Sequence, residues 1–537
     1  MKLLRNLENF HMQKSPGISS SWRESVSGSL GHGKAFSSTI GGSGNVHNVT
    51  ATAGTSITLT GNVTTANASG NTVSLTAPSI DIGNATIDTN NTNNDGNVSF
   101  IVNNLTNTGT IDAGTATFQI APNTVTHVIE FGSSNSGNIS EDAFYDSDFG
   151  SVTAGTFLIG SASHTGNIFI ANDGGTLSFG SALSVQNSNS GIITIGDYTS
   201  SNDALTLTSA AGVKFLDLIN GTSTVNLGSG ALTIAGAATL ADNVNITATG
   251  GISFSSTIDA DNAGSNDRTL TMTSGTGSTI AVAGNIGASQ ALSGLTITQS
   301  NGTTFSGTVD VSDSNSGTIT ITDTEDGSDI TFAGSVTTDT LDLAQTGYDL
   351  IFNGGGTFTN AVTFDNTGTL NLGNASGDTF TFNGGLTETT TGTVTLASAI
   401  SSSNDAISFG AVTLGANTTI DTNASNTTGD LTIGVVTGGN NTLTLSTGNN
   451  VANSDITASG NISGVTTLTL ADVGGTATLS GDVDVTTLTV GNTVLNVAFT
   501  GNGSSVVDAV AFANDGTLIL GTSGGTQTYN GGLTTTS

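Results

Sequence analysis

The chain has 537 residues, of which 74 are Gly and only 9% are charged, so its composition is far from that of an ordinary soluble enzyme. Residues 35–537 carry two basic side chains against 38 acidic ones, a net charge of −36, which excludes binding to a nucleic-acid backbone and favours cations as partners. The sequence contains no Cys, which excludes a disulfide framework and a thiolate metal site.

The first 40 residues differ from the rest of the chain. They hold five of the seven basic residues, and Leu3, Leu4, Leu7 and Phe10 show helical spacing. We therefore expect an irregular basic N-terminal segment or cap over 1–40, with a short helix at its start. The apolar run of a signal peptide is not visible, so either the true start of the protein lies upstream, which we expect, or export uses another route. No segment reaches the roughly 18 consecutive apolar residues of a membrane helix, so we expect no transmembrane segment.

Over residues 41–537, apolar and polar residues alternate in short runs. Examples are ALTLTS at 204–209, GTITITDT at 317–324 and NTLTLST at 441–447. This period of two indicates strands with one buried face. Turn clusters rich in Gly, Asn, Asp and Ser separate the runs, with no spacing for crossover helices. The pattern predicts an all-β fold in which one parallel β-helix, a continuous β-solenoid, covers 41–537.

The predicted solenoid has a simple core. With roughly 20 to 25 residues per coil and about 4.8 Å between coils, it would form a rod on the order of 100 Å long. We expect Val, Ile, Leu, Ala and Phe to face inward, including a stack of Phe305, Phe332 and Phe352. Thr, Ser, Asn and Asp would face outward, where Thr and Asn of neighbouring coils can form ladders. The main alternative is an array of antiparallel β-sandwich domains, which should recur about every 90 to 100 residues with linkers.

An internal repeat favours the solenoid over the sandwich. Residues 316–343 match residues 463–490 at an offset of 147. Similarly, AVTFDNTGTLNLG at 361–373 meets AVAFANDGTLILG at 509–521 at an offset of 148. The second copy ends shortly after YNGGLT, where the first copy continues into another alternating segment. We therefore expect an open edge at this end, and a chain that is part of a longer protein or a truncated gene product.

Two acidic clusters are candidates for calcium binding, because carboxylate oxygens are the ligands that Ca²⁺ prefers. Neither cluster has the spacing of an EF-hand loop, and solvated acidic turns are the alternative interpretation. Calcium is the only cofactor that the sequence suggests. The candidate ligands are Glu141, Asp142, Asp146 and Asp148 in the first cluster, and Asp323, Glu325, Asp326 and Asp329 in the second.

Two patterns that resemble catalytic motifs lack the context that they require. GSLGHGKA at 28–35 has Ala35 where a P-loop needs Ser or Thr, and no apolar strand precedes it. GTSGG at 521–525 has the spacing of a nucleophile elbow around Ser523, but no His follows it. We therefore expect that the chain is not an enzyme and has no catalytic or cofactor-binding residues. A carbohydrate-active β-helix that uses a chance pair of carboxylates is the catalytic alternative.

Several segments resemble the β-strand repeats of very large bacterial surface proteins, the filamentous haemagglutinin-like and autotransporter-like adhesins. These segments are LTITQSNGTTFSGTVDVS at 295–312, AVTFDNTGTLNLGN at 361–374 and FTFNGGLTETTTGTVTL at 380–396. The resemblance covers roughly residues 40 to 537. It implies a secreted, right-handed β-helix that projects from the cell and supports adhesion. The signal peptide and secretion domain of the family pattern are not visible in this sequence.

The sequence and the resemblance together lead to one functional hypothesis. We expect a secreted or cell-surface structural and adhesive repeat protein, extracellular or on the bacterial outer surface, whose acidic rod attaches to cells, glycans or surfaces. Its expected partners are cell-surface glycans or proteins, with self-association along the rod. A threonine-rich binder of ice or another crystal surface is a further alternative, suggested by Thr-x-Thr runs such as Thr318, Thr320 and Thr322.

Overall fold

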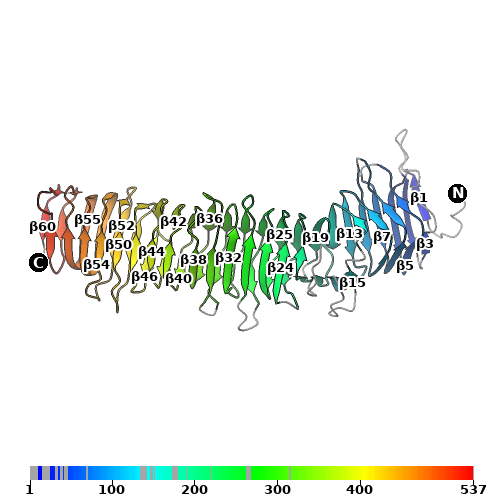
Figure 1. Cartoon of the computed structure of the whole chain (residues 1–537), viewed down its shortest axis with the longest axis horizontal. Coiled ribbons are helices and arrows are strands. Elements are labelled where there is room, and N and C mark those ends of the chain that lie inside the picture. Colours follow the sequence, from blue (N-terminus) through cyan, green and yellow to red (C-terminus); the bar gives the residue numbers. More distant parts are fainter. Residues whose placement is uncertain are drawn as a thin grey trace. The chain divides into compact units, whose positions relative to one another are not determined.

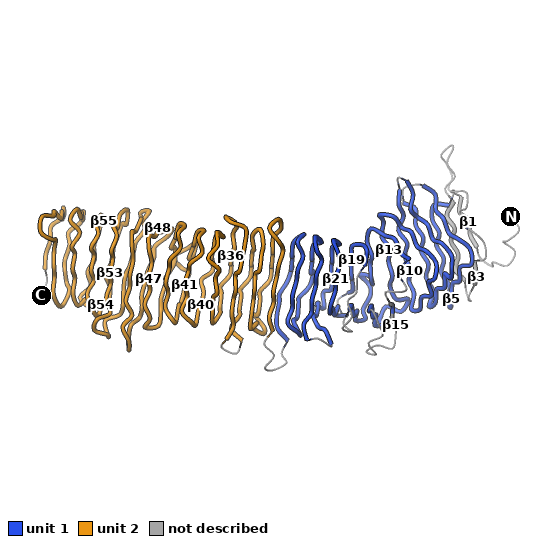
Figure 2. The backbone as a smooth tube through the Cα atoms, in the orientation of Figure 1, with its two compact units in different colours: residues 1–261 blue, residues 262–537 orange. Residues whose placement is uncertain are grey.

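The structure is a computed structural model of the whole chain. It describes residues 10–14, 24–30, 34–36, 40, 46–67, 70–92, 94–132, 142–145, 149, 151–171, 179–188, 190–218, 221–261, 268–313 and 316–535. These residues form strands and turns, with no α-helix among them. The chain divides into two compact units, residues 1–261 and 262–537 (Figure 2). In each unit, parallel strands stack coil on coil (Figure 1), which confirms the predicted all-β solenoid and excludes the sandwich.

The strands begin within the segment for which we expected an irregular or helical start. β1 (Phe10–Lys14) pairs antiparallel with β2 (Glu24–Leu30). β2 then pairs in parallel with β4 (Val46–Ala53), and β3 (Lys34–Phe36) pairs in parallel with β5 (Ser56–Leu59). Leu3, Leu4 and Leu7, three of the four residues with helical spacing, lie outside the described residues. The fourth, Phe10, is the first residue of a strand.

Unit 1 contains one long parallel ladder and several shorter ones. The long ladder continues from β2 and β4 through β7 (Thr72–Thr76), β10 (Asn97–Ile101), β13 (Thr117–Ala121), β17 (Thr156–Gly160), β19 (Ala182–Gln186), β22 (Leu205–Thr208), β25 (Leu232–Ala235) and β28 (Ile252–Phe254). A second ladder contains β15 (Asp142–Tyr145), β14 (Ile129–Gly132), β18 (Ile168–Ile170), β20 (Ile193–Ile195), β23 (Val213–Phe215), β26 (Ala238–Leu240) and β29 (Ile258–Ala260). The shorter ladders are β5 with β8 (Ser79–Gly83) and β11 (Asn104–Asn107); β6 (Val63–Thr64) with β9 (Thr86–Asp88), β12 (Thr110–Asp112) and β16 (Val152–Thr153); and β21 (Tyr198–Thr199) with β24 (Thr222–Asn226) and β27 (Asn243–Thr247).

In unit 2, most coils contribute one strand to each of three faces, which we name after their side chains. The phenylalanine face contains β31 (Ile280–Val282), β33 (Thr303–Phe305), β36 (Asp329–Phe332), β39 (Asp349–Phe352), β42 (Leu370–Leu372), β45 (Val394–Leu396), β48 (Val412–Leu414) and β51 (Val436–Thr437). The threonine face contains β34 (Val309–Val311), β37 (Val336–Thr338), β40 (Gly356–Phe358), β43 (Thr379–Phe382), β46 (Ala399–Ser402), β49 (Thr418–Asp421) and β52 (Thr442–Ser446). The hydroxyl face contains β41 (Val362–Phe364), β44 (Leu386–Glu388), β47 (Ile407–Phe409), β50 (Leu431–Ile433) and β53 (Ile456–Ala458).

The remaining strands of unit 2 extend these faces at both ends. β30 (Thr269–Thr273), β32 (Gly294–Gln299), β35 (Thr318–Ile321) and β38 (Thr340–Leu343) form one parallel ladder. β54 (Ile462–Leu479) and β55 (Val483–Phe499) each run continuously through all three faces. The last strands are β56 (Ser505–Val506), β57 (Val510–Phe512), β58 (Leu518–Leu520), β59 (Thr528–Tyr529) and β60 (Leu533–Thr535).

The alternating sequence explains the core, because a strand directs successive side chains to opposite faces. In β52, Leu443 and Leu445 are fully buried between half-buried threonines. The expected aromatic stack also forms: the ring centroids of Phe305 and Phe332 lie 5.0 Å apart, and those of Phe332 and Phe352 lie 4.9 Å apart. Each coil therefore buries its apolar side chains against the equivalent side chains of the next coil.

Asn and Asp side chains at the corners of the coils hydrogen-bond to the backbone of the following coil. The backbone N–H of Thr442 donates to Asn417 Oδ1 at 3.0 Å, and that of Thr369 donates to Asp349 Oδ1 at 2.6 Å. In unit 1, Thr86 N–H donates in the same way to Asn62 Oδ1 at 2.9 Å. These contacts satisfy backbone donors where the strands end, so the turn residues also determine how neighbouring coils align.

The internal repeat does not span a whole number of coils. Phe332 lies in β36 on the phenylalanine face, whereas its aligned copy Leu479 pairs with Ala458 of β53 on the hydroxyl face. Likewise, Phe364 lies on the hydroxyl face, whereas its copy Phe512 lies in β57, which pairs with the threonine-face part of β55. Residues that the sequence aligns therefore lie on different faces of the solenoid. The surface of one copy of the repeat cannot be derived from that of the other.

Candidate functional site

The first predicted calcium cluster lies mostly outside the described residues. Glu141, Asp146 and Asp148 lie outside the described residues, whereas Asp142 is the first residue of β15.

The second predicted cluster occupies the exposed turn between β35 and β36. Asp323 and Asp326 each contact a neighbouring coil: Gln299 Nε2 donates to Asp323 Oδ2 at 3.5 Å, and Gly347 N–H donates to Asp326 Oδ1 at 3.2 Å. Glu325 is also exposed in this turn. Within the described ranges, no group of three or more His, Asp or Glu side chains is placed to hold a metal ion.

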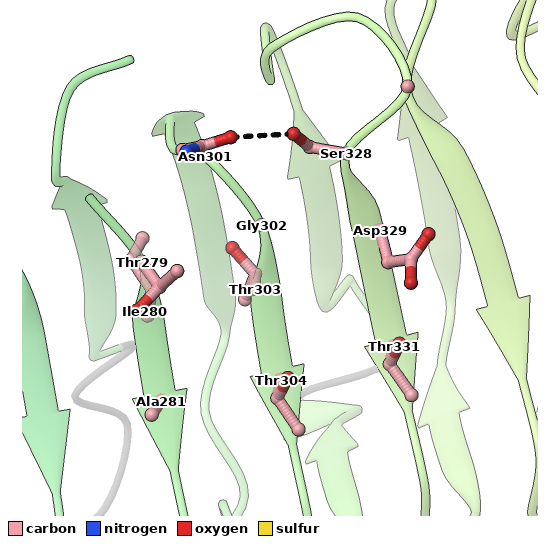
Figure 3. Close-up of a pocket in the computed structure, with 11 residues that line it drawn as sticks. Thr279, Ile280, Ala281, Asn301, Gly302, Thr303, Thr304, Ser328, Asp329 and Thr331 are labelled. Carbon is pink, nitrogen blue, oxygen red and sulfur yellow. Dashed lines mark hydrogen bonds between the residues drawn. The ribbon is translucent and has the colours of Figure 1, made fainter. Parts of the chain in front are cut away.

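The fourth member of that cluster, Asp329, lines a groove on the outer side of the phenylalanine face (Figure 3). The groove has a volume of about 340 Å³ and crosses β31, β33 and β36. Thr304 and Thr331 project into it from paired positions on neighbouring strands. At its rim, Ser328 Oγ donates to Asn301 Oδ1 at 2.8 Å. Hydroxyl, amide and carboxylate groups therefore line one shallow depression, and they could bind the hydroxyl groups of a polar ligand.

A second and more extended feature lies on the hydroxyl face. Six hydroxyl side chains occupy outward positions on successive strands, each paired with the next. We call them the long hydroxyl row; its members are Thr363, Thr387, Ser408, Thr432, Thr457 and Thr478. Their neighbours along each strand point inward, as Val362 and Phe364 do on either side of Thr363. The alternation within three-residue strands thus presents one hydroxyl per coil.

The hydroxyl groups of this row are available to a ligand. Among the described residues, none of the six hydroxyls has a hydrogen-bond partner in the protein, whereas hydroxyls at the corners of coils commonly bond to backbone. Thr466 Oγ1, for example, donates to the carbonyl of Asn440 at 2.8 Å. Sequence reasoning identified the alternating strands but missed the row, because the x-Thr-x triplets do not reveal which coils place them in register.

One carboxylate on the same face points inward instead. Glu388 is paired with Phe364 and is only 7% exposed. Its Oε2 accepts the backbone N–H of Gly410 at 2.9 Å, and its Oε1 is buried with no partner in the structure. Since Glu388 is buried and one of its carboxylate oxygens bonds to the backbone of the next coil, we interpret it as a polar member of the core.

Two other buried groups, Tyr348 and His164, have pKa values shifted toward their neutral forms. Burial raises the pKa of Tyr348, and the carboxylates of Asp365 and Asp342 raise it further. Burial lowers the pKa of His164 from its ordinary value, and His127 lowers it again. Tyr348 and His164 therefore add no charge to the core at neutral pH.

No protein-family model, curated protein or solved structure matches this chain. In the part of the chain that the structure describes, no helix is long and apolar enough to span a membrane. The function of this chain is therefore inferred from the surface of the solenoid itself.

Proposed function

We propose that this chain is a structural and adhesive repeat protein that works outside the cell and attaches to extended polar polymers, chiefly glycans. The long hydroxyl row carries this proposal. At about 4.8 Å per coil, its six hydroxyls extend over about 24 Å in a straight line. A linear polymer laid along them could form one hydrogen bond per coil. We assign no catalysis to the chain.

Many weak contacts suit such attachment. A single hydrogen bond contributes only about 0.5 to 1.5 kcal/mol net, because it replaces a bond to water. Contacts that form together on one rigid support gain from effective concentration, so that their sum exceeds what any one of them supplies. The regular pairing of the coils provides this support.

The charge of the surface selects among glycans. Residues 269–537 contain 21 acidic residues and no Lys or Arg, a net charge of −21. Sulfated or uronate-rich chains would be repelled by this surface. The expected ligand is therefore a neutral polysaccharide or one that contains free amino groups.

Binding of the full chain to immobilised dextran, chitosan and heparin would test this proposal. We expect binding to the neutral or the amino-sugar polymer and none to heparin. The double substitution Thr432→Val and Thr457→Val should weaken binding about 30-fold, from the loss of two hydrogen bonds of about 1 kcal/mol each. Thr413→Val, in a similar outward position on the phenylalanine face, is the matched control.

Two results would contradict the proposal. One is the absence of binding to any polymer of the panel, together with unchanged attachment of cells that lack the protein. The other is an equal loss of binding in the double variant and in Thr413→Val, which would show that the hydroxyl row is not the contact surface.

A further inference from the structure

The threonine face carries a two-dimensional arrangement of threonines that the long hydroxyl row lacks. In β52, β54 and β55, a Thr-Leu-Thr triplet lies in register with the same triplet of the next coil. The first threonines of the three triplets pair with one another and form one row, and the second threonines form another row. Thr419 of β49 pairs with Thr444 and so extends the second row by one coil. We call this set the threonine array; it consists of Thr419, Thr442, Thr444, Thr467, Thr469, Thr487 and Thr489.

The threonine array lies on a packed core of leucine side chains. The central Leu443 and Leu468 of two triplets are fully buried, and Leu488 of the third is only 3% exposed. Threonine is β-branched and has few accessible χ1 rotamers, so each methyl and hydroxyl group has a restricted position. The threonine side chains therefore lose little conformational freedom when an ordered ligand binds to them.

Most hydroxyls of the array are unused within the protein. Among the described residues, only Thr487 has a side-chain partner, Asp508, whose Oδ2 accepts its hydroxyl proton at 2.6 Å at the edge of the array. The hydroxyls of the other six threonines have no hydrogen-bond partner within the described ranges. They can therefore donate to and accept from an external lattice.

The spacing of the array is close to that of ordered water. Neighbouring coils are about 4.8 Å apart, and alternate residues of one strand are about 6.7 Å apart. In a tetrahedral water lattice with O···O bonds of about 2.75 Å, second-neighbour oxygens lie about 4.5 Å apart, and the repeat across the puckered layers is about 7.4 Å. Both spacings agree within about a tenth, so the mismatch over four coils stays below about 1 Å.

Charge also distinguishes the array from its surroundings. A carboxylate orders its own hydration shell and would disrupt a water lattice, and unit 2 carries many carboxylates. All seven positions of the array are nevertheless occupied by uncharged threonine. The same neutrality makes a mineral surface, which consists of ions, a poor ligand.

We propose that the threonine array binds ice. Its methyl groups and free hydroxyls order water in the spacing of a crystal face, and the rigid coils below hold that water in place. This function is independent of the proposed attachment to glycans, which uses a different face of unit 2.

Thermal hysteresis and partition of the full chain into slowly growing ice would test the proposal. We expect the wild-type chain to produce hysteresis and to concentrate in the ice. Thr469→Lys, at the centre of the array, should reduce hysteresis about tenfold, because it disrupts contacts that act together. Thr413→Lys, which places the same side chain at an outward position on another face, should leave hysteresis unchanged.

A wild-type chain that is excluded from ice and shows no more hysteresis than buffer would overturn the proposal. Equal hysteresis in the wild type and a folded Thr469→Lys variant would also overturn it. If this variant does not fold, Thr444→Val takes its place, since it keeps the shape of the side chain and removes only the hydroxyl. Binding to the polysaccharide panel, measured on the same variants, should not change and separates the two functions.

Discussion

The phenylalanine side chains of unit 2 show how single residues hold neighbouring coils together. Phe305, Phe332 and Phe352 occupy paired positions on three successive coils, and all three are fully buried. Their rings are nearly parallel, at 19° and 6° in the two contacts. Phe332 therefore contacts both neighbouring coils, and its removal affects two interfaces at once.

Replacement of this central ring should be costly. We expect Phe332→Ala to lower the free energy of unfolding by about 3 to 5 kcal/mol, because it leaves a cavity between two coils. Thr331→Ala, which changes the adjacent outward side chain, should alter it by less than about 0.5 kcal/mol. Urea unfolding of both variants measures the difference, and similar midpoints would show that the stack does not stabilise unit 2.

A carboxylate in unit 1 links two coils in a way that depends on pH. Asp95 Oδ2 accepts hydrogen bonds from the side chain and the backbone N–H of Thr115, both at 2.7 Å, and its Oδ1 accepts the backbone N–H of Asn91 at 3.0 Å. These bonds, the first from the Thr115 side chain, lower the pKa of Asp95 from its ordinary value of 3.8.

Because the pKa is lower in the folded chain, the ionised form of Asp95 stabilises the fold. That contribution is fully present above the unfolded pKa of 3.8 and is lost as the pH falls through the folded pKa. We expect Asp95→Asn to lower the melting temperature at pH 6 and to have a smaller effect well below pH 3.8. Thermal melts at both values measure this, and an effect that is independent of pH would contradict the assignment.

At the scale of elements, the close approach of successive coils restricts which residues can occupy the turns. A Cβ atom added to Gly392 would overlap the backbone carbonyl of Gly368 in the preceding coil. A Cβ atom added to Gly377, in another turn of unit 2, would meet no atom within 4 Å. Turn glycines therefore serve different purposes, and only some of them are required by contact between coils.

This difference can be measured with two matched substitutions. We expect Gly392→Ala to destabilise unit 2 by about 1 to 3 kcal/mol, because the coils must separate to admit the methyl group. Gly377→Ala should have little effect. Equal urea midpoints for the two variants would show that the coils adjust to the added methyl group without cost.

The strands could be predicted from the sequence because alternation is a local property. GTITITDT contains β35 and NTLTLST contains β52, and the stack of three phenylalanines was also expected. The register between coils could not be predicted, since the turns differ in length: 18 residues separate the paired Thr395 and Thr413, whereas 24 separate Thr413 and Thr437. The long hydroxyl row and the threonine array depend on that register, so only the structure reveals them.

At the scale of the whole molecule, the imbalance of charge should control stability. Ion pairs with Lys or Arg cannot form within residues 269–537, because this part has no basic residue to oppose its 21 carboxylates. The carboxylates repel one another. At physiological ionic strength, salt largely screens the repulsion between exposed carboxylates that lie more than about 8 Å apart.

We therefore expect the melting temperature to rise when NaCl is added to a low-salt buffer at pH 7. The rise should disappear at a pH below the carboxylate pKa values of about 4, where the charges are neutralised. A rise of the same size at low pH would contradict the repulsion. If Ca²⁺ stabilises the chain more than NaCl of equal ionic strength, a bound cation on the acidic turns would account for the excess.

The pairing of each coil with the coils before and after it also limits how such a chain can change its length. Leu370 pairs with Leu350 on one side and with Val394 on the other. If residues 370–393 were lost, Val394 would take the place of Leu370 against Leu350, and inward side chains would still meet inward side chains. Loss of half that segment would set a turn against a strand. Turns can vary in length while the strands stay paired, but insertions and deletions that include strands should survive only in steps of whole coils, so that the number of coils changes in discrete units.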